Sequence, residues 1–445
     1  MARLFGTDGV RGVANTELTA QMAFQLGQAG AYVLGQAHRA PRILVGKDTR
    51  VSGDMLECAL AAGICSVGGE AIFAGVMTTP GVAYLARKYG CAAGAVISAS
   101  HNPMEYNGIK FFDGEGFKLP DAVEDEIEAV IRRGGPEQLP AGAGLGRTER
   151  VDGRGDYLAF LKGLSEADLT GLKIVVDCAN GAASALAPQL LRDLGAEVVD
   201  INDSPDGRNI NDHCGSTYLK PLQRAVLLNH AHLGLAFDGD ADRMLAVDEL
   251  GRGVDGDQIM AICAMDMKSR GLLDHDTLVV TVMSNLGLDI AMRKRGIRLE
   301  KTAVGDRYVL ERMKQGGFAI GGEQSGHVIL LHQQTTGDGL VSALYLLGSL
   351  RRAGKPLSEL AGTVQVLPQI LINARVGSDK EAYKRDSTIM DEIARIEAKY
   401  QGEGRVLIRP SGTEPLVRVM IEGADLEDIT REANDLATLI SQRMA

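Results

Sequence analysis

The chain has 445 residues, of which 45% are hydrophobic, and its formal net charge is −11. At roughly 150 residues per domain, this length predicts three or four domains rather than a single core. The acidic balance argues against a general nucleic-acid binder or a protein that adheres to anionic membranes. No apolar run approaches the roughly 18 residues of a membrane span, and the N-terminus lacks a signal-peptide stretch. We therefore expect a cytoplasmic protein with reduced cysteines.

Alternating apolar segments predict helices and strands in the same arrangement three times along the chain. In the first copy, helices cover 19–35, 54–67 and 80–89 and strands cover 42–46, 70–75 and 94–98. In the second copy, helices cover 155–164, 184–194 and 218–229 and strands cover 172–177, 196–201 and 233–237. In the third copy, helices cover 256–268, 287–295 and 306–315 and strands cover 277–283, 298–303 and 318–322.

The segment 133–154 is rich in Gly and Pro and lacks periodicity, as a connector would. After a helix at 339–352, the remainder predicts strands at 366–376, 404–408 and 416–422 and helices at 380–399 and 426–443. The predicted fold is therefore α/β, with three similar α/β domains whose mixed sheets are layered between helices, and a smaller C-terminal α+β domain, around a central cleft. We place the domains at 1–152, 153–255, 256–366 and 367–445.

In each copy the third strand ends in an unusual polar loop that is followed by another apolar run. The three loops contain Ser100, the segment 238–243 and the segment 322–327. Sites in open α/β sheets gather at the carboxyl ends of strands, so three equivalent loops can face one cleft. Alternation alone is common to all α/β proteins, but the matching positions of these loops favour a repeat.

Ser100 stands in Ala-Val-Ile-Ser-Ala-Ser-His-Asn-Pro, where an apolar strand stops at a turn. A hydroxyl in this place can face a cleft and carry a group between two substrates. Ser-X-X-Pro turns are common without any function, so the segment gains its weight from the other loops.

Asp238, Asp240 and Asp242 alternate, which puts three carboxylates on one side of an extended or turning segment. Such oxygen ligands suit a hard divalent cation. An EF-hand is excluded because Arg243 occupies the position that needs Gly and because the segment follows a strand. Mg²⁺ fits better, since it keeps few protein ligands and favours phosphate as a partner. The alternative is a solvated acidic turn, in which the carboxylates would repel one another.

Two further loops offer groups for a sugar phosphate. One loop predicts an anion cradle made of Arg409, Ser411, Gly412 and Thr413, with Arg418 close behind. It lacks the spacing of a nucleotide P-loop, and the alternative is an ordinary hairpin turn. In the other loop, Glu323 and Ser325 can bind vicinal sugar hydroxyls. His327 can transfer protons near neutral pH, or it can have a purely structural role.

Cations accompany these loops. Lys110 lies in the strand after the serine loop, where it can act as a base or as an electrostatic aid. Arg11 stands in a Gly-rich turn, and Lys47 and Arg50 stand at a strand end. Surface charge is the alternative for these three.

With four such loops in this order, the chain resembles the α-D-phosphohexomutase superfamily over its whole length. The opening Phe-Gly-Thr-Asp-Gly-Val-Arg-Gly and Gln324 are typical of the branch that acts on glucosamine phosphates. The resemblance implies that Ser100 is a phosphoserine required for activity and that Asp238, Asp240 and Asp242 bind one Mg²⁺ per chain together with it. By the same resemblance, Glu323 and Ser325 hold the sugar, and Arg409, Ser411, Gly412 and Thr413 hold its phosphate.

The implied reaction interconverts glucosamine 6-phosphate and glucosamine 1-phosphate through a bisphosphorylated sugar and supplies UDP-N-acetylglucosamine for cell-wall synthesis. The resemblance implies Lys110 or His327 as the general acid/base, with Arg11 and Arg243 assisting, and the residues do not choose between them. Alternatives are a phosphomannomutase/phosphoglucomutase, a sugar-phosphate phosphatase and a non-catalytic sensor. The oligomeric state stays open, with a homodimer as one candidate.

Overall fold

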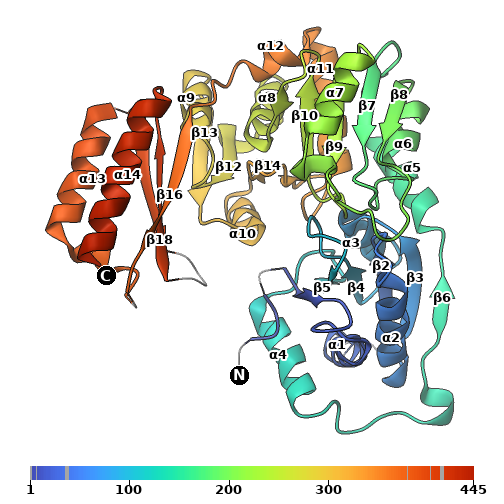
Figure 1. The fold of residues 1–445 in the computed structure, drawn as a ribbon. Helices are drawn as coiled ribbons and strands as arrows, with labels where there is room; N and C mark the ends of the chain where they lie inside the picture. Colours follow the sequence, from blue (N-terminus) through green and yellow to red (C-terminus); the bar gives the residue numbers. More distant parts are fainter. Residues whose placement is uncertain are drawn as a thin grey trace. The chain divides into compact units, whose positions relative to one another are not determined.

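A computed structural model describes residues 3–6, 8–35, 40–377, 379–400, 402–410 and 415–444. The chain divides into two compact units (Figure 1). The first comprises Met1–Met283 and Ile297–Gly362, and the second comprises Ser284–Gly296 and Thr363–Ala445. Among the described residues, no helix is both long and apolar enough to cross a membrane.

The first unit contains three mixed sheets. The first sheet has the strand order β1-β5-β4-β2-β3-β6, with β2 parallel to β3 and β4, and β5 antiparallel to β4. Its elements are β1 (Val10–Val13), α1 (Ala20–Leu34), β2 (Arg42–Lys47), α2 (Gly53–Ser66), β3 (Glu70–Val76), α3 (Thr79–Lys88), β4 (Ala93–Ile97), β5 (Tyr106–Asp113), α4 (Asp121–Arg132) and β6 (Thr148–Arg150).

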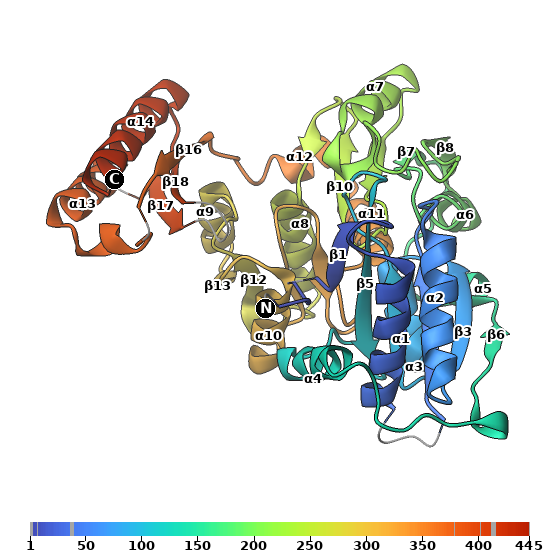
Figure 2. The ribbon, with the colours of Figure 1, turned by 60° about the horizontal axis from the view of Figure 1, so that its bottom comes forward.

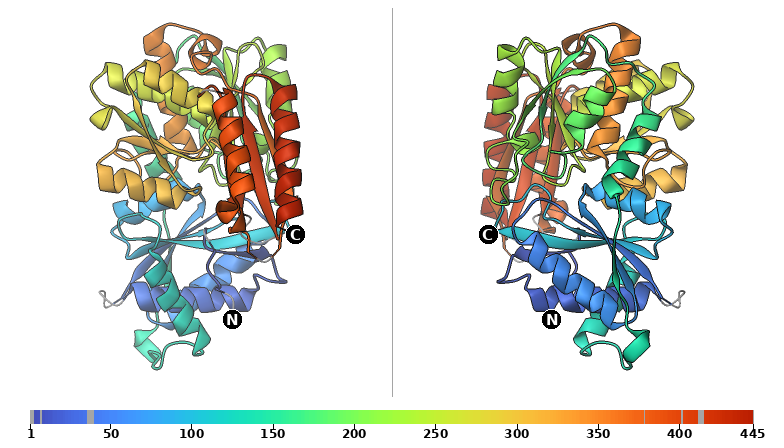
Figure 3. Two further views of the ribbon diagram at one scale, coloured as in Figure 1. Left: turned by 90° about the vertical axis from the view of Figure 1, so that its left-hand side faces the viewer. Right: turned by 90° about the vertical axis from the view of Figure 1, so that its right-hand side faces the viewer.

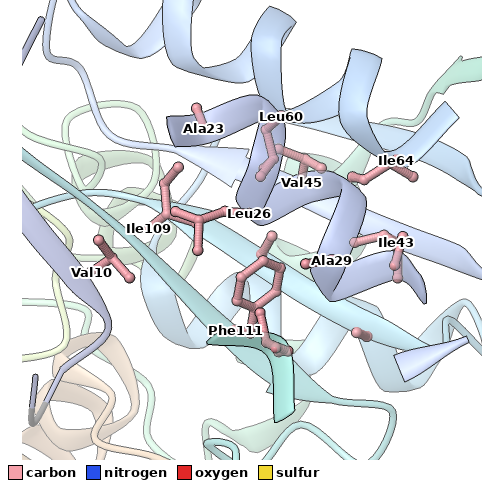
Figure 4. Close-up of a cluster of buried hydrophobic side chains, with 14 of the residues drawn as sticks. Val10, Ala23, Leu26, Ala29, Ile43, Val45, Leu60, Ile64, Ile109 and Phe111 are labelled. Carbon is pink, nitrogen blue, oxygen red and sulfur yellow. The ribbon is translucent and has the colours of Figure 1, made fainter. Parts of the chain in front are cut away.

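Both faces of the first sheet are buried, because successive side chains along each strand point alternately toward two layers of helices. Ile43 and Val45 of β2 belong to the cluster that packs against α1 and α2 (Figure 4). These two helices run side by side over one face of the sheet (Figures 2 and 3). On the other face, a Cβ at Gly46 would lie 2.4 Å from Val82 of α3. Each fully buried Ile or Leu contributes about 1.5–3 kcal/mol, so this layering is a main source of stability.

The second and third sheets follow the same plan. Their strand orders are β11-β10-β9-β7-β8 and β13-β12-β14-β15. The second group of elements is α5 (Gly153–Leu164), β7 (Lys173–Asp177), α6 (Ala187–Asp193), β8 (Glu197–Ile201), α7 (Lys220–Leu228), β9 (Leu233–Phe237), β10 (Met244–Asp248) and β11 (Gly253–Val254). The third group is α8 (Gly256–Ser269), β12 (Thr277–Thr281), β13 (Arg298–Thr302), α10 (Asp306–Gly316), β14 (Ile320–Gly322), β15 (Val328–Leu330), α11 (Gly339–Ala353) and α12 (Leu357–Ala361).

One connection recurs in all three sheets. The strands β4, β9 and β14 each end in a polar loop and return as an antiparallel neighbour. Each loop contains a residue with positive φ: Ser100 at 52°, Ala241 at 55° and Gly326 at 91°. The repeated α/β organisation predicted from the polar loops is therefore confirmed.

The second unit is a small α+β structure. Its strands β16 (Gln369–Arg375), β18 (Leu416–Glu422) and β17 (Arg405–Pro410) pair antiparallel in that order. Helices α13 (Ser387–Tyr400) and α14 (Leu426–Arg443) cover one face (Figure 3, left), and α9 (Leu286–Lys294) belongs to the same unit. Ile389, Ile396 and Leu436 are fully buried in its core.

Several element boundaries differ from the sequence prediction. The helix expected from 380 begins at Ser387, because a short 3₁₀ turn (Ala382–Arg385) precedes it and the Asp386 carboxylate accepts the amides of Thr388 and Ile389. Part of the predicted connector 133–154 is β6, which pairs with β3. Besides β6, four helices and strands among the described residues were not predicted, namely β1, α4, β11 and α12.

Candidate active site

Ser100 lies three residues beyond the end of β4 and is 1% exposed. Its hydroxyl donates to Asp238 Oδ2 over 2.7 Å, and its Oγ is 3.3 Å from His101 Nδ1. The predicted serine loop and the predicted aspartate loop therefore meet, although 138 residues separate the two side chains.

The three aspartates form one buried cluster at the end of β9. The oxygens that Asp238, Asp240 and Asp242 offer lie within 4.8 Å of one another, and each residue is at most 4% exposed. Oδ1 of Asp240 and Oδ1 of Asp242 are buried, and neither has a hydrogen-bond partner in the part of the chain that the structure describes. Unpaired buried carboxylate oxygens are costly, and a divalent cation would satisfy them. The donor set therefore fits a hard cation such as Mg²⁺.

The surroundings shift the pKa values of Asp238 and Asp242 in opposite directions. Burial raises the pKa of Asp238 well above its ordinary range, and the neighbouring charges of Asp242 and Asp240 raise it further. Burial acts in the same direction on Asp242, but contact with His327 and the charge of Lys110 outweigh it and lower that pKa. Carboxylates this close disfavour simultaneous ionisation unless positive charge lies between them.

Lys110 lies on β5 and is 3% exposed. Its Nζ is 2.9 Å from Asp240 Oδ2 and 3.3 Å from Asp8 Oδ2. Burial alone would lower the pKa of Lys110, but the charges of Asp240 and Asp8 overcome it and raise the pKa to about 12. At neutral pH the side chain is therefore an ammonium, suited to donate hydrogen bonds and positive charge.

His327 follows the third polar loop and is buried. Its Nδ1 lies 3.6 Å from Asp242 Oδ2, and its Nε2 lies 3.6 Å from Asp306 Oδ2. Burial would lower the pKa of His327, but the hydrogen bond and charge of Asp242 raise it. The Gly337 amide donates to Nε2 over 3.1 Å, so the neutral ring carries its proton on Nδ1, facing Asp242.

Arg11 and Arg243 lie beside these carboxylates. Arg11 pairs with Asp8, and Arg243 Nε is 3.9 Å from Asp242 Oδ1. In both side chains Nε is buried without a hydrogen-bond partner among the described residues. Two guanidinium groups with unused donors at a carboxylate cluster suit an anionic ligand.

The third loop presents Glu323 and Ser325. Glu323 Oε1 accepts the Gly305 amide over 3.2 Å, and Ser325 is exposed. Between them, the Gln324 amide donates to Asp255 Oδ2 over 3.0 Å, and Asp255 is the N-cap of α8. Gln324 therefore fixes the loop to that helix.

The predicted phosphate loop belongs to the second unit. Arg409 on β17 and Arg418 on β18 are directly opposite each other in the sheet, and both are half-buried. Ser411, Gly412 and Thr413 lie outside the described residues.

Sequence reasoning did not find three charged residues beside the site. Lys118 Nζ contacts Asp8 Oδ1 at 2.7 Å and also pairs with Asp306, the first residue of α10. The Gly-rich turn 5–12 contained Asp8, but only Arg11 was chosen from it. Nothing in the pattern around Lys118 or Asp306 indicated the pairing. Together these contacts form a continuous series that runs from Asp242 through His327, Asp306, Lys118, Asp8 and Lys110 to Asp240.

Family models of phosphoglucomutase/phosphomannomutase match almost the whole chain. Alpha/beta/alpha domains I, II and III match residues 2–137, 156–251 and 255–366, and the C-terminal domain matches 371–439. The chain belongs to the phosphoglucomutase/phosphomannomutase family. The family membership predicted from the polar loops is thereby confirmed.

Individual members of the phosphoglucomutase/phosphomannomutase family are similar over the full length. The phosphoglucosamine mutase of Thermoanaerobacter sp. (strain X514) is 57% identical over 446 residues, which cover 100% of both chains. A crystal structure of a phosphoglucomutase/phosphomannomutase family protein from Burkholderia thailandensis has a TM-score of 0.80 and 26% identity, and the match covers 98% of each chain. Aspergillus fumigatus N-acetylphosphoglucosamine mutase, in complex with GlcNAc-6P and magnesium, shares the fold at a TM-score of 0.68 and 19% identity, over 99% of this chain and 95% of that one.

Proposed function

We propose that this chain is a mutase that interconverts glucosamine 6-phosphate and glucosamine 1-phosphate, with Ser100 as the phosphoryl carrier. The observation that carries the proposal is the 2.7 Å contact between Ser100 Oγ and Asp238 within a buried carboxylate cluster. The substrate rests on the relative named phosphoglucosamine mutase, which is 57% identical over the whole chain.

The proposed reaction consists of two successive transfers of two different phosphoryl groups. In the first, the Ser100 Oγ–P bond breaks as a sugar hydroxyl oxygen bonds to phosphorus, and the hydroxyl passes its proton to a proton-transfer group of the site. The resulting sugar bisphosphate turns over in the site. In the second, the bond between the sugar's original oxygen and its phosphorus breaks as Ser100 Oγ bonds to that phosphorus, and the sugar oxygen takes the proton back. The cycle therefore requires phosphorylated Ser100 at its start.

One Mg²⁺ held by Asp238, Asp240 and Asp242 would neutralise charge on the phosphoryl oxygens. Lys110 contributes a fixed ammonium 2.9 Å from Asp240 Oδ2. Arg11 and Arg243 have donors available for further phosphoryl oxygens. Lys110 and His327 stay the proposed proton-transfer groups, with Arg11 and Arg243 assisting.

The remaining predicted residues bind the substrate in this proposal. Glu323 and Ser325 hold sugar hydroxyls, and the second unit supplies the phosphate cradle of Arg409, Ser411, Gly412, Thr413 and Arg418. That cradle has to accept a phosphate at either end of the sugar. The segments 1–152, 153–255, 256–366 and 367–445 would then supply the phosphoserine, the metal ligands, the sugar contacts and the phosphate contacts. A homodimer in the cytoplasm remains a prediction.

A coupled assay with phosphorylated protein tests the substrate. We expect glucosamine 6-phosphate to give the highest kcat/KM, ahead of the 6-phosphates of glucose and mannose. If the glucosamine compound is the poorest of the three, the assignment is wrong and a phosphomannomutase/phosphoglucomutase takes its place. Labelled phosphate on Ser100 should pass to sugar; release to water as the main route would indicate a phosphatase.

A further inference from the structure

The backbone at Ser100 has an unfavourable conformation. Its φ of 52° lies in the left-handed region, which costs about 1–3 kcal/mol for a residue other than glycine unless the surroundings hold it. The same residue carries the reactive hydroxyl of the proposed function. The groups that hold this backbone therefore decide where the hydroxyl points.

Arg50 is the first of these groups. The sequence left it as a strand-end cation or a surface charge, but its side chain is wholly buried and paired with Asp48. Its Nη2 donates to Ser100 O over 2.9 Å and to Asn102 O over 2.8 Å. Its Nη1 donates to Tyr106 O over 3.1 Å and also to Pro103 O. One planar guanidinium thus binds four carbonyls of the loop that follows Ser100.

Asn211 is the second group, and it comes from the loops of the second sheet. Its Nδ2 donates to the same two carbonyls, Ser100 O over 2.8 Å and Asn102 O over 3.0 Å. The backbone amide of Asn211 donates to Ala179 O over 2.9 Å, in the loop after β7. Each of these two carbonyls therefore accepts one bond from the part of the chain that carries the first sheet and one from the part that carries the second.

Neither side chain is placed to touch the transferred group. Both bind the carbonyl of Ser100, whereas the Ser100 hydroxyl donates to Asp238. The Ser100 amide is held separately, by Ser98 Oγ at 2.9 Å. The carbonyl contacts therefore act on the direction of the hydroxyl through the backbone.

We propose that Arg50 and Asn211 form a carbonyl clamp that positions Ser100 for phosphoryl transfer. This inference rests on the proposed function of Ser100, and it assigns both side chains as positioning residues. Asn211 and Asp238 both lie in loops of the second sheet. The clamp therefore also fixes the distance between the Ser100 hydroxyl and Asp238. Small misplacements of a reacting atom can reduce rates by about a hundredfold, so the effect should be measurable.

The test measures phosphorylation of Ser100 directly. Full-length dephosphorylated protein is mixed with glucose 1,6-bisphosphate and Mg²⁺, and intact mass follows the gain of phosphate with time. Asn211→Asp keeps the shape and tolerates the positive φ of 58° at this position, but it replaces the donor with a carboxylate that repels both carbonyls. We expect it to slow the maximal rate about a hundredfold, and Asn211→Ala about tenfold, with little change in the bisphosphate concentration at half-maximal rate.

Thr49→Val is the matched control. Thr49 Oγ1 donates to Asn180 O over 2.6 Å, so it also joins the two parts of the chain, but this bond goes to the loop after β7 and not to the serine loop. We expect its rate within about twofold of wild type. If Thr49→Val slows phosphorylation as much as Asn211→Ala does, the rate depends on the packing of the first sheet's loops against those of the second sheet, and the clamp is contradicted.

Arg50→Lys tests the other half of the clamp, because a single ammonium cannot reproduce the planar fork. We expect at least a hundredfold slower phosphorylation; if this variant does not fold, Asn211→Asp, which lies in a loop, decides alone. Wild-type rates in both Asn211 variants would overturn the clamp. If wild-type protein itself gains no phosphate on Ser100, the proposed function fails rather than the clamp.

Discussion

The loops after β4 and β9 have the same connection but are completed in different ways. Both join antiparallel neighbours, and both contain one residue other than glycine with positive φ. In the first loop that residue is Ser100, whose amide and carbonyl are both held by protein groups. In the second it is Ala241, and Oδ1 of Asp240 and Oδ1 of Asp242 have no hydrogen-bond partner among the described residues.

The first loop is thus held in place by the chain itself, whereas the second offers buried oxygens that a bound cation would satisfy. Substitutions of the side chains that hold the backbone of the first loop should change the rate of chemistry without changing the response to Mg²⁺. Substitutions in the second should change that response first.

Ser100→Ala should have the largest effect on activity, about a ten-thousandfold loss of kcat, because it removes the proposed phosphoryl carrier. The measurement is turnover in the coupled assay, with thermal unfolding as the check on folding. Activity above 1% of wild type would show that the first loop is not the carrier.

Asp238→Asn should abolish the stabilisation by Mg²⁺ and reduce turnover about a thousandfold. Wild-type protein should gain about 2.7 kcal/mol in free energy of unfolding at a cation concentration one hundred times Kd. In metal-free protein the variant should be more stable than wild type, because one of the mutually repelling buried carboxylates is neutral. Thermal unfolding with and without Mg²⁺ measures both effects. An unchanged Mg²⁺ response would contradict the role of the second loop.

Lys110→Met should lower kcat about a hundredfold and destabilise the protein by about 3–5 kcal/mol, since the buried Asp240 carboxylate loses its ammonium partner, whereas Asp8 keeps Lys118 and Arg11. Lys110→Arg keeps the charge and should recover part of the stability. Denaturant unfolding and steady-state kinetics measure the two quantities. If the methionine variant keeps wild-type kcat, the ammonium contributes only to folding.

Ser98→Ala should have the smallest effect, a few-fold slower phosphorylation of Ser100. It removes the acceptor of the Ser100 amide and a 2.6 Å bond to Asp48. Ser349→Ala is the matched control, because Ser349 is also buried and donates one bond, to Tyr345 O, far along the chain from the site. Both should cost about 1 kcal/mol of stability. Only Ser98→Ala should change the phosphorylation rate.

The sequence predicted the parts of this site that follow from local pattern. Alternating carboxylates after a buried strand and a serine at a strand end indicated where chemistry would lie, and the strand order brought them together. The clamp was not predictable in this way. Arg50 and Asn211 bind backbone carbonyls, which every residue has, so no pairing of residue types indicates them. Asp8 and Lys118 were missed for a related reason, because charges far apart in sequence reveal a buried pair only once the fold brings them together.

The hydrogen bonds between the first two sheets have a consequence for how a sugar phosphate enters. Beside the site, Thr49 bonds to Asn180, the Val51 amide bonds to Gly207, and Thr79 bonds to Asp240 through both its amide and its hydroxyl. These hydrogen bonds join the loops of the first sheet to the loops of the second sheet. We therefore expect Ser100 and the three aspartates to keep their relative positions while a sugar phosphate binds and leaves.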